Sequence, residues 1–111
     1  MISNNECLIL GLLAETPRYG YEIDQTIDDR GLREWTEIGF SSIYYLLNKM
    51  EKDGLLTSEK ISSGNRPAKK RYALVENAWP LLKEALLLRL STPSNSPTGF
   101  SIGLAYANLL N

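Results

Sequence analysis

The 111-residue sequence predicts a mainly α-helical fold with one small β-hairpin, and three observations support this prediction. In the first half of the chain, apolar residues recur every three or four positions in three successive segments. Two short segments with alternating side chains then flank a Gly/Pro turn. A leucine-rich helical segment follows them, and the total length suits a single hydrophobic core.

The first two predicted helices are short and amphipathic. Residues 7–15 carry leucine and isoleucine at helical spacing, and Pro17 ends the segment because proline disfavours helix in the residue before it. The second helix is expected over residues 19–30, with Ile23 and Ile27 facing inward and its acidic residues facing water.

The third predicted helix covers residues 40–53, after an extended connector anchored by Trp35 and Ile38. Its apolar stripe indicates that one face is buried. The stripe consists of Ile43, Leu46, Leu47 and Met50. The opposite surface carries Ser41, Ser42, Tyr45, Asn48, Lys49 and Lys52.

A β-hairpin and a fourth helix complete the predicted fold. Residues 55–62 and 68–74 are the two strands, and the turn between them is rich in Ser, Gly, Asn and Pro. The fourth helix, 76–90, is apolar over more than one stripe, so it needs two burial partners. One partner is its own domain, and a second subunit is a candidate for the other. A Ser/Pro linker over 91–99 and a short apolar helix candidate end the chain.

The composition argues against several classes of function. The sequence has no histidine and one cysteine, which removes the commonest general base, the commonest metal ligand and any internal disulfide. We therefore expect no enzyme, no metal site and no cofactor, and we interpret Cys7 as a small core residue. No apolar run reaches about 18 residues, as a membrane-spanning helix requires. A lone cysteine suits a reducing compartment, so we expect a cytoplasmic protein.

Positive charge is concentrated in one part of a slightly acidic chain. The chain has 12 Lys and Arg against 13 Asp and Glu. Residues 1–40 hold three bases and eight acids, whereas residues 41–74 hold seven bases and three acids. Local attraction of phosphate is set within about 8 Å at physiological salt, so such a block suits contact with a nucleic acid. A merely solvated hairpin explains the charge equally well.

The order of the elements decides between these two interpretations. Three helices, a hairpin and a further helix form a winged helix-turn-helix with a C-terminal helical segment. Helix 40–53 then fits the major groove of DNA, where its polar side chains meet base edges and phosphates. The hairpin straddles the neighbouring backbone, and each phosphate that it neutralises adds about −0.9 to the salt slope.

The sequence also resembles the PadR-like family of transcriptional regulators over residues 8–86. The motifs are LILGLLAETPRYGYEI at 8–23, SSIYYLLNKMEKDGLL at 41–56 and SSGNRPAKKRYAL at 62–74. The resemblance implies a tight turn into the second helix at Gly20-Tyr21. It also implies a recognition helix that starts near Ser41, Ser42 and Tyr44, and a wing tipped by Gly64, Arg66 and Pro67.

The chain departs from the family pattern in three places. Ser41-Ser42 stands where members often have Gly-Thr, and residues 75–78 replace the usual Thr-x-x-Gly start of the next helix. Members also typically continue into a longer C-terminal helical region used for dimerisation. We accordingly expect residues 1–75 to be the DNA-binding domain and residues 76–111 to be a dimerisation region.

Residues for DNA contact follow from these two lines of reasoning. We expect base or groove contacts from Ser42, Tyr45, Asn48 and Lys49. We expect backbone contacts from Ser41, Tyr44, Lys52, Arg66, Lys69, Lys70 and Arg71. Tyr44 falls between the two faces of its helix, so partial burial in the core is the alternative for it, as simple solvation is for Lys52.

The C-terminal part offers candidates for a subunit interface and an effector site. Leu82, Leu86 and Leu90 suit a dimer interface, or else a buried face within the chain. The resemblance implies a response to small aromatic or hydrophobic compounds. Trp35 and Trp79 are candidates to line such a site, with ordinary packing as the alternative.

The function expected from this reasoning is a dimeric transcriptional regulator, most often a repressor in this family, on an inverted-repeat operator. One alternative is a winged-helix module whose basic hairpin docks on an acidic protein. Another is a ligand sensor with degenerate DNA contacts.

Overall fold

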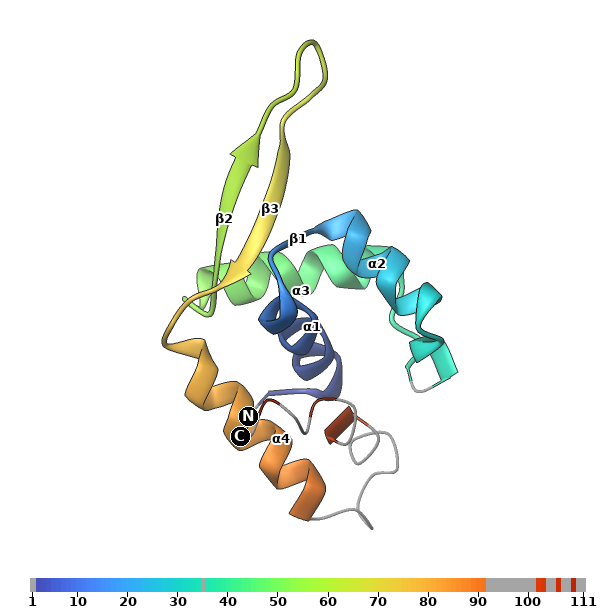
Figure 1. Cartoon of the computed structure of the whole chain (residues 1–111), viewed down its shortest axis with the longest axis vertical. Coiled ribbons are helices and arrows are strands. Elements are labelled where there is room, and N and C mark those ends of the chain that lie inside the picture. The colour runs from blue at the N-terminus through green and yellow to red at the C-terminus, as the bar shows by residue number, and fades with distance from the viewer. Residues whose placement is uncertain (1, 35, 92–101, 104–105, 107–108, 110–111) are drawn as a thin grey trace.

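The computed structural model describes residues 2–34, 36–91, 102–103, 106 and 109, and it confirms the predicted fold class. Helices and a small antiparallel sheet follow one another in the expected order (Figure 1). The elements are α1 (Asn4–Glu15), β1 (Arg18–Tyr19), α2 (Gly20–Asp29), the 3-10 turn η1 (Leu32–Glu34), α3 (Phe40–Lys52), β2 (Leu56–Ile61), β3 (Lys69–Leu74) and α4 (Ala78–Ser91).

Helix α1 lies at the centre of the domain and starts earlier than predicted. The Ser3 hydroxyl accepts from the Glu6 N–H, while the Glu6 carboxylate accepts from the Ser3 N–H. This capping box moves the start from residue 7 to Asn4. Every residue from Cys7 to Leu13 is buried, and burial raises the pKa of the Cys7 thiol to about 11. Cys7 is a core residue, as expected.

Helices α2 and α3 form the helix-turn-helix. The predicted inward residues Ile23 and Ile27 are fully buried, as are Ile43, Leu47 and Met50 of the predicted stripe. Ile38 is also buried, which confirms it as an anchor of the connector, whereas Trp35 lies outside the described residues. The connector is not extended throughout, because η1 forms a turn of 3-10 helix. The Arg33 guanidinium secures this turn by bonding Asp24 and Asp28 of α2.

The wing, which we define as β2, β3 and the loop between them, projects from the helical body (Figure 1). Its strands pair antiparallel from Leu56 opposite Leu74 to Ile61 opposite Lys69, so the predicted hairpin is confirmed. Strand β1, which was not predicted, pairs with the free edge of β3 and gives the strand order β1-β3-β2.

Helix α4 turns its two predicted interface leucines inward. Leu82 and Leu86 are fully buried among the core residues of the same chain, so the expectation that they meet a second subunit is corrected. Their side chains are already covered within the chain. Leu90 is half-buried, and the exposed leucines of this helix are Leu81, Leu87 and Leu88. The helix begins at Ala78 rather than at residue 76.

The described part of the C-terminal tail packs onto the core. Ile102 and Tyr106 are buried and belong to the same hydrophobic cluster as α1. A Cβ at Gly11 would lie 2.7 Å from the Tyr106 ring, which is closer than real Cβ contacts come. The absence of a side chain at Gly11 therefore allows the Tyr106 ring to lie directly on α1.

An ion pair ties α1 to α3. The Lys49 ammonium lies 2.8 Å from the Glu6 carboxylate, whose side chain is 9% exposed. Burial raises the pKa of Glu6, but hydrogen bonds from Lys49 and Ser3 outweigh it and leave the pKa below its usual value. The same hydrogen bond raises the pKa of Lys49. The pair thus joins the recognition helix to the capped end of the central helix.

We expect Gly11→Ala to destabilise the chain by about 1–3 kcal/mol, because the new methyl overpacks against Tyr106. In a Tyr106→Ala background, the same substitution should instead stabilise by about 0.5–1 kcal/mol, since alanine is the better helix former. Urea unfolding followed by circular dichroism measures both effects. Stabilisation by Gly11→Ala in both backgrounds would contradict the packing of the tail on α1.

We expect Glu6→Gln to lower the free energy of unfolding at pH 7 by about 1 kcal/mol, because glutamine keeps the capping box but loses the charge. Because the pKa of Glu6 is lower in the folded state, its charge stabilises the fold at pH values above the unfolded-state pKa. This stabilisation is lost as the pH falls through the folded-state pKa. The difference between the variant and the wild type should therefore shrink below pH 4.5. Thermal unfolding from pH 3 to 7 tests this, with the exposed Glu37→Gln as control; a gap that widens in acid would overturn it.

Candidate nucleic-acid interface

The outer face of α3 is polar and open to solvent. Ile43, Leu47 and Met50 turn the other face into the core, which leaves this one free. The exposed residues are Ser41, Ser42, Tyr45, Asn48, Lys49 and Lys52, all predicted contact residues. Part of this face forms a shallow hollow of about 330 Å³. Its donors and acceptors match the groups that read base edges in the major groove.

The N-terminus of α3 adds backbone donors to this face. Gly39 is the N-cap and supplies no side-chain cap, and the first intrahelical bond of the helix runs from the Ile43 N–H to the Gly39 carbonyl. The N–H groups of the preceding turn therefore have no helical partner. Ser41 and Ser42 lie in this exposed turn, where amides and hydroxyls together suit a phosphate oxygen.

Tyr44 lies at the contact between α2 and α3. Its ring covers Gly20 so closely that a Cβ there would lie 2.5 Å from the ring, and it also packs against Phe40. Partial burial raises the pKa of the Tyr44 hydroxyl. The side chain is therefore half-buried, as the alternative interpretation held, and its ring spaces the two helices apart.

The lysines and arginines of α3 and of the wing differ in whether a carboxylate of the same chain lies near them. Lys49 bonds Glu6, as described above. In the wing, Lys70 lies 3.6 Å from Glu51 of α3, and Arg71 lies 3.8 Å from Glu59 of β2. Exposed pairs of this kind contribute about 1 kcal/mol or less, so a phosphate can compete for their cations.

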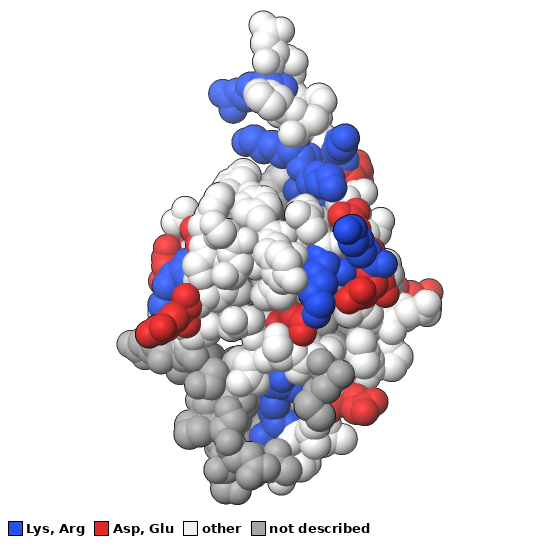
Figure 2. Space-filling model, turned by 180° about the vertical axis from the view of Figure 1, so that it is seen from behind, with Lys and Arg blue, Asp and Glu red and all other residues white. Residues whose placement is uncertain are grey.

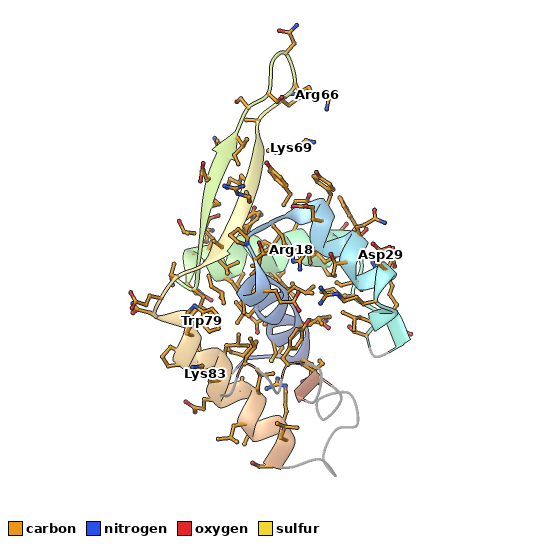
Figure 3. The ribbon with its side chains drawn as sticks, in the orientation of Figure 1. Arg18, Asp29, Arg66, Lys69, Trp79 and Lys83 are labelled. Atoms are coloured by element: carbon orange, nitrogen blue, oxygen red, sulfur yellow. The ribbon has the colours of Figure 1, made fainter. Side chains whose placement is uncertain are left out.

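Arg66 and Lys69 project from the same side of the wing (Figure 3). Arg66 follows a tip turn in which Gly64 has a positive φ of 59° and the Arg66 N–H donates to the Ser63 carbonyl. Within the described residues, neither cation has a carboxylate within 4.0 Å. Figure 2 shows the result: Lys and Arg gather on the projecting wing, while most Asp and Glu lie lower on the body.

A groove lined by tyrosines separates the wing from the helices, and three of its tyrosines, Tyr19, Tyr21 and Tyr72, were not among the predicted contact residues. Tyr19 and Tyr21 stack with ring centroids 5.6 Å apart and planes at 11°. Between them and β3 lies a groove of about 390 Å³ that Tyr44, Tyr72 and Lys69 also line. The motif YGY, placed where a strand meets a helix, was the available signal.

These features place three structural elements around one surface. The beginning of α2, Tyr44 of α3 and the outer half of β3 all border the tyrosine groove. The surface offers cations, hydroxyls and amides. In the described residues, no three His, Cys, Asp or Glu side chains are grouped to hold a metal ion. The cations, hydroxyls and amides of this surface are groups that suit the binding of a polyanion.

The remaining predicted residues lie elsewhere or have no described position. Trp79 is half-buried at the start of α4, below the base of the wing and far from Arg66 at its tip (Figure 3). Trp35 lies outside the described residues, so an effector site formed by the two tryptophans stays a prediction. None of the described helices is long and apolar enough to cross a membrane.

Comparison with known proteins gives the family. The PadR-like family of transcriptional regulators matches residues 9–77, more than half of the chain. No relative was found among curated protein sequences.

Solved structures resemble the chain over most of its length. Bacillus subtilis PadR in complex with operator DNA is 28% identical, with a TM-score of 0.66 over 71% of this chain and 44% of that one. A Streptococcus mutans UA159 protein is 34% identical, with a TM-score of 0.67 over 78% of this chain and 49% of that one. A PadR family regulator from Eggerthella lenta DSM 2243 is 30% identical, with a TM-score of 0.62 over 71% of this chain and 65% of that one.

The chain thus spans less than half of the operator-bound protein. What the two share is the winged helix-turn-helix fold. The PadR-like proteins are transcription factors and not enzymes, in agreement with the composition. The chain belongs to the PadR-like family of transcriptional regulators.

Proposed function

We propose that this chain binds operator DNA in the cytoplasm as a homodimer and represses transcription. Helix α3 enters the major groove, and the wing follows the adjacent backbone. The observation that carries the proposal is that α3, whose outer face is polar and exposed, also contributes Tyr44 to the tyrosine groove that Lys69 and Lys70 of the wing line. The Bacillus subtilis relative, solved with operator DNA, supports the same use of the shared fold.

The proposal of a homodimer is based on the exposed leucines of α4. Leu81, Leu87 and Leu88 are 39%, 56% and 44% exposed, and they replace the predicted Leu82 and Leu86 as interface candidates. Large apolar side chains grouped on one helix favour burial against a partner. Two copies joined in this way present two recognition helices to an inverted repeat whose half-sites lie about one helical turn apart.

The proposal includes control by a small aromatic or hydrophobic compound. The apolar hollow beside α4, lined by Ile2, Leu81, Ala85 and Leu88 among others, measures about 120 Å³. Ligand sites usually measure about 300–1,000 Å³, so a complete effector site here requires the second subunit.

DNA binding is tested by fluorescence anisotropy with labelled DNA from upstream of the protein's own coding region and a scrambled duplex as competitor. We expect tighter binding to the native duplex and steep weakening with salt, since each phosphate contact contributes about −0.9 to the slope. Arg66→Glu should weaken binding to both duplexes and reduce the slope by about one.

Lys83→Glu is the matched control, because this exposed lysine of α4 lies far from Arg66 and its reversal changes the net charge equally (Figure 3). It should leave affinity within about twofold, since a charge beyond a Debye length is screened. Equal losses in the two variants would show that net charge alone drives binding. The absence of binding at low salt would sink the proposal and favour an acidic protein partner.

A further inference from the structure

The stacked tyrosines stand where the wing leaves the body of the domain. Tyr19 belongs to β1 and pairs with Arg71 of β3, while Tyr21 lies in the first turn of α2. The 5.6 Å stack therefore links the sheet to the helix-turn-helix through two adjacent elements. Neither ring belongs to the hydrophobic core, and Tyr21 is 47% exposed, so core packing does not account for them.

Lys69 of β3 also contacts Tyr21 and so adds a second link between the wing and α2. Its ammonium lies 5.0 Å from the centroid of the Tyr21 ring, within the range of a cation–π contact. Lys69 is the first residue of β3 and pairs with Ile61, the last residue of β2. Residues 62–68 beyond this pair are all exposed. The contact with Tyr21 thus lies at the outermost paired position of the wing.

The rings of Tyr19 and Tyr21 also lie next to the loop at the tip of the wing. A small hollow of about 110 Å³ is lined by Tyr19 and Tyr21 together with Arg66, Pro67 and Lys69. The rings therefore border both the tyrosine groove and the approach to the tip. An isolated hairpin is marginally stable in water, so its direction depends on such outside support.

We propose that Tyr21 is a positioning residue for the wing. Its ring holds the Lys69 ammonium and, through the stack on Tyr19, sets the angle of the wing to α3 before DNA arrives. A wing that is already held at this angle loses less conformational entropy when DNA binds. This improves the affinity without a new contact. This inference rests on the proposed function, because it assigns a role within DNA binding.

A direct role for Tyr21 is the competing explanation. A tyrosine hydroxyl on this surface can donate to a DNA phosphate, and in that case the hydroxyl matters rather than the ring. The two roles separate chemically. Phenylalanine keeps the ring, its stack and its attraction for the ammonium, but has no hydroxyl. Alanine removes all of them and is tolerated in an exposed helical turn.

The test compares Tyr21→Ala with Tyr21→Phe in the anisotropy assay at several salt concentrations. We expect Tyr21→Ala to weaken binding to the native duplex about fivefold. It should also reduce the salt slope by up to about one, because Lys69 is no longer held toward the backbone. Tyr21→Phe should stay within about twofold of the wild type, with the slope unchanged. A loss with Tyr21→Phe as large as with alanine would overturn the proposal and assign the hydroxyl to DNA.

A double-mutant cycle tests whether Tyr21 acts through Lys69. In a Lys69→Gln background, Tyr21→Ala should cause little further loss, since the ammonium that the ring holds is already absent. Full additivity of the two losses would contradict a shared role. Circular dichroism of each variant checks that the fold is intact.

A measurement without DNA keeps this inference separate from the proposed function. In the NMR spectrum of the free protein, the Lys69 side-chain methylene protons next to the ammonium should be shifted upfield by the Tyr21 ring. The shift should persist in Tyr21→Phe and vanish in Tyr21→Ala. If it is absent in the wild type, the positioning contact does not exist, whatever the protein binds. If it is present but no duplex is bound, the proposed function fails and the role in DNA binding falls with it.

Discussion

The close approach of α3 to the start of α2 is the constraint on which the rest of the surface depends. Gly20 has no side chain, and the Tyr44 ring occupies the space that a Cβ would need. Gly20 also lies between the strand β1, which pairs with the wing, and Tyr21, whose ring meets Lys69. Residues 18–21 thus fix the recognition helix and the wing relative to each other. A larger residue at position 20 would have to displace Tyr44 and with it the start of the recognition helix.

Carboxylates of the same chain neutralise several of the cations that face the proposed DNA. Glu6 holds Lys49, Glu51 holds Lys70 and Glu59 lies near Arg71. The pair with Glu6 involves a buried carboxylate and also stabilises the fold, whereas the wing pairs are exposed and weak. DNA therefore competes with these carboxylates for Lys70 and Arg71, whereas Arg66 and Lys69 have no carboxylate within 4.0 Å among the described residues. Such an arrangement disfavours nonspecific coating of DNA.

Elements whose periodicity extends over many residues could be predicted from the sequence. Helices α1 to α3 and the hairpin followed from three- and two-residue spacing, and Ile23, Ile27 and Ile38 were correctly expected inside. Strand β1 has two residues, too few to show a period. Helix α4 is apolar on so many sides that spacing could not tell its inward leucines from its outward ones, which is why a subunit interface and a buried face within the chain both stayed open for Leu82 and Leu86. The bond between Glu6 and Lys49 joins residues 43 positions apart, and no local pattern encodes it.

The central claim is that α3 and the wing form one surface for duplex DNA. The most direct measurement is a titration of the ¹⁵N-labelled protein with the native duplex, following every backbone amide by NMR. The account predicts that the largest chemical shift changes fall at residues 39–49 and 63–72 and around Tyr21. The amides of α4 should change little when DNA is added. Shifts confined to α4, or spread evenly over the chain, would contradict it.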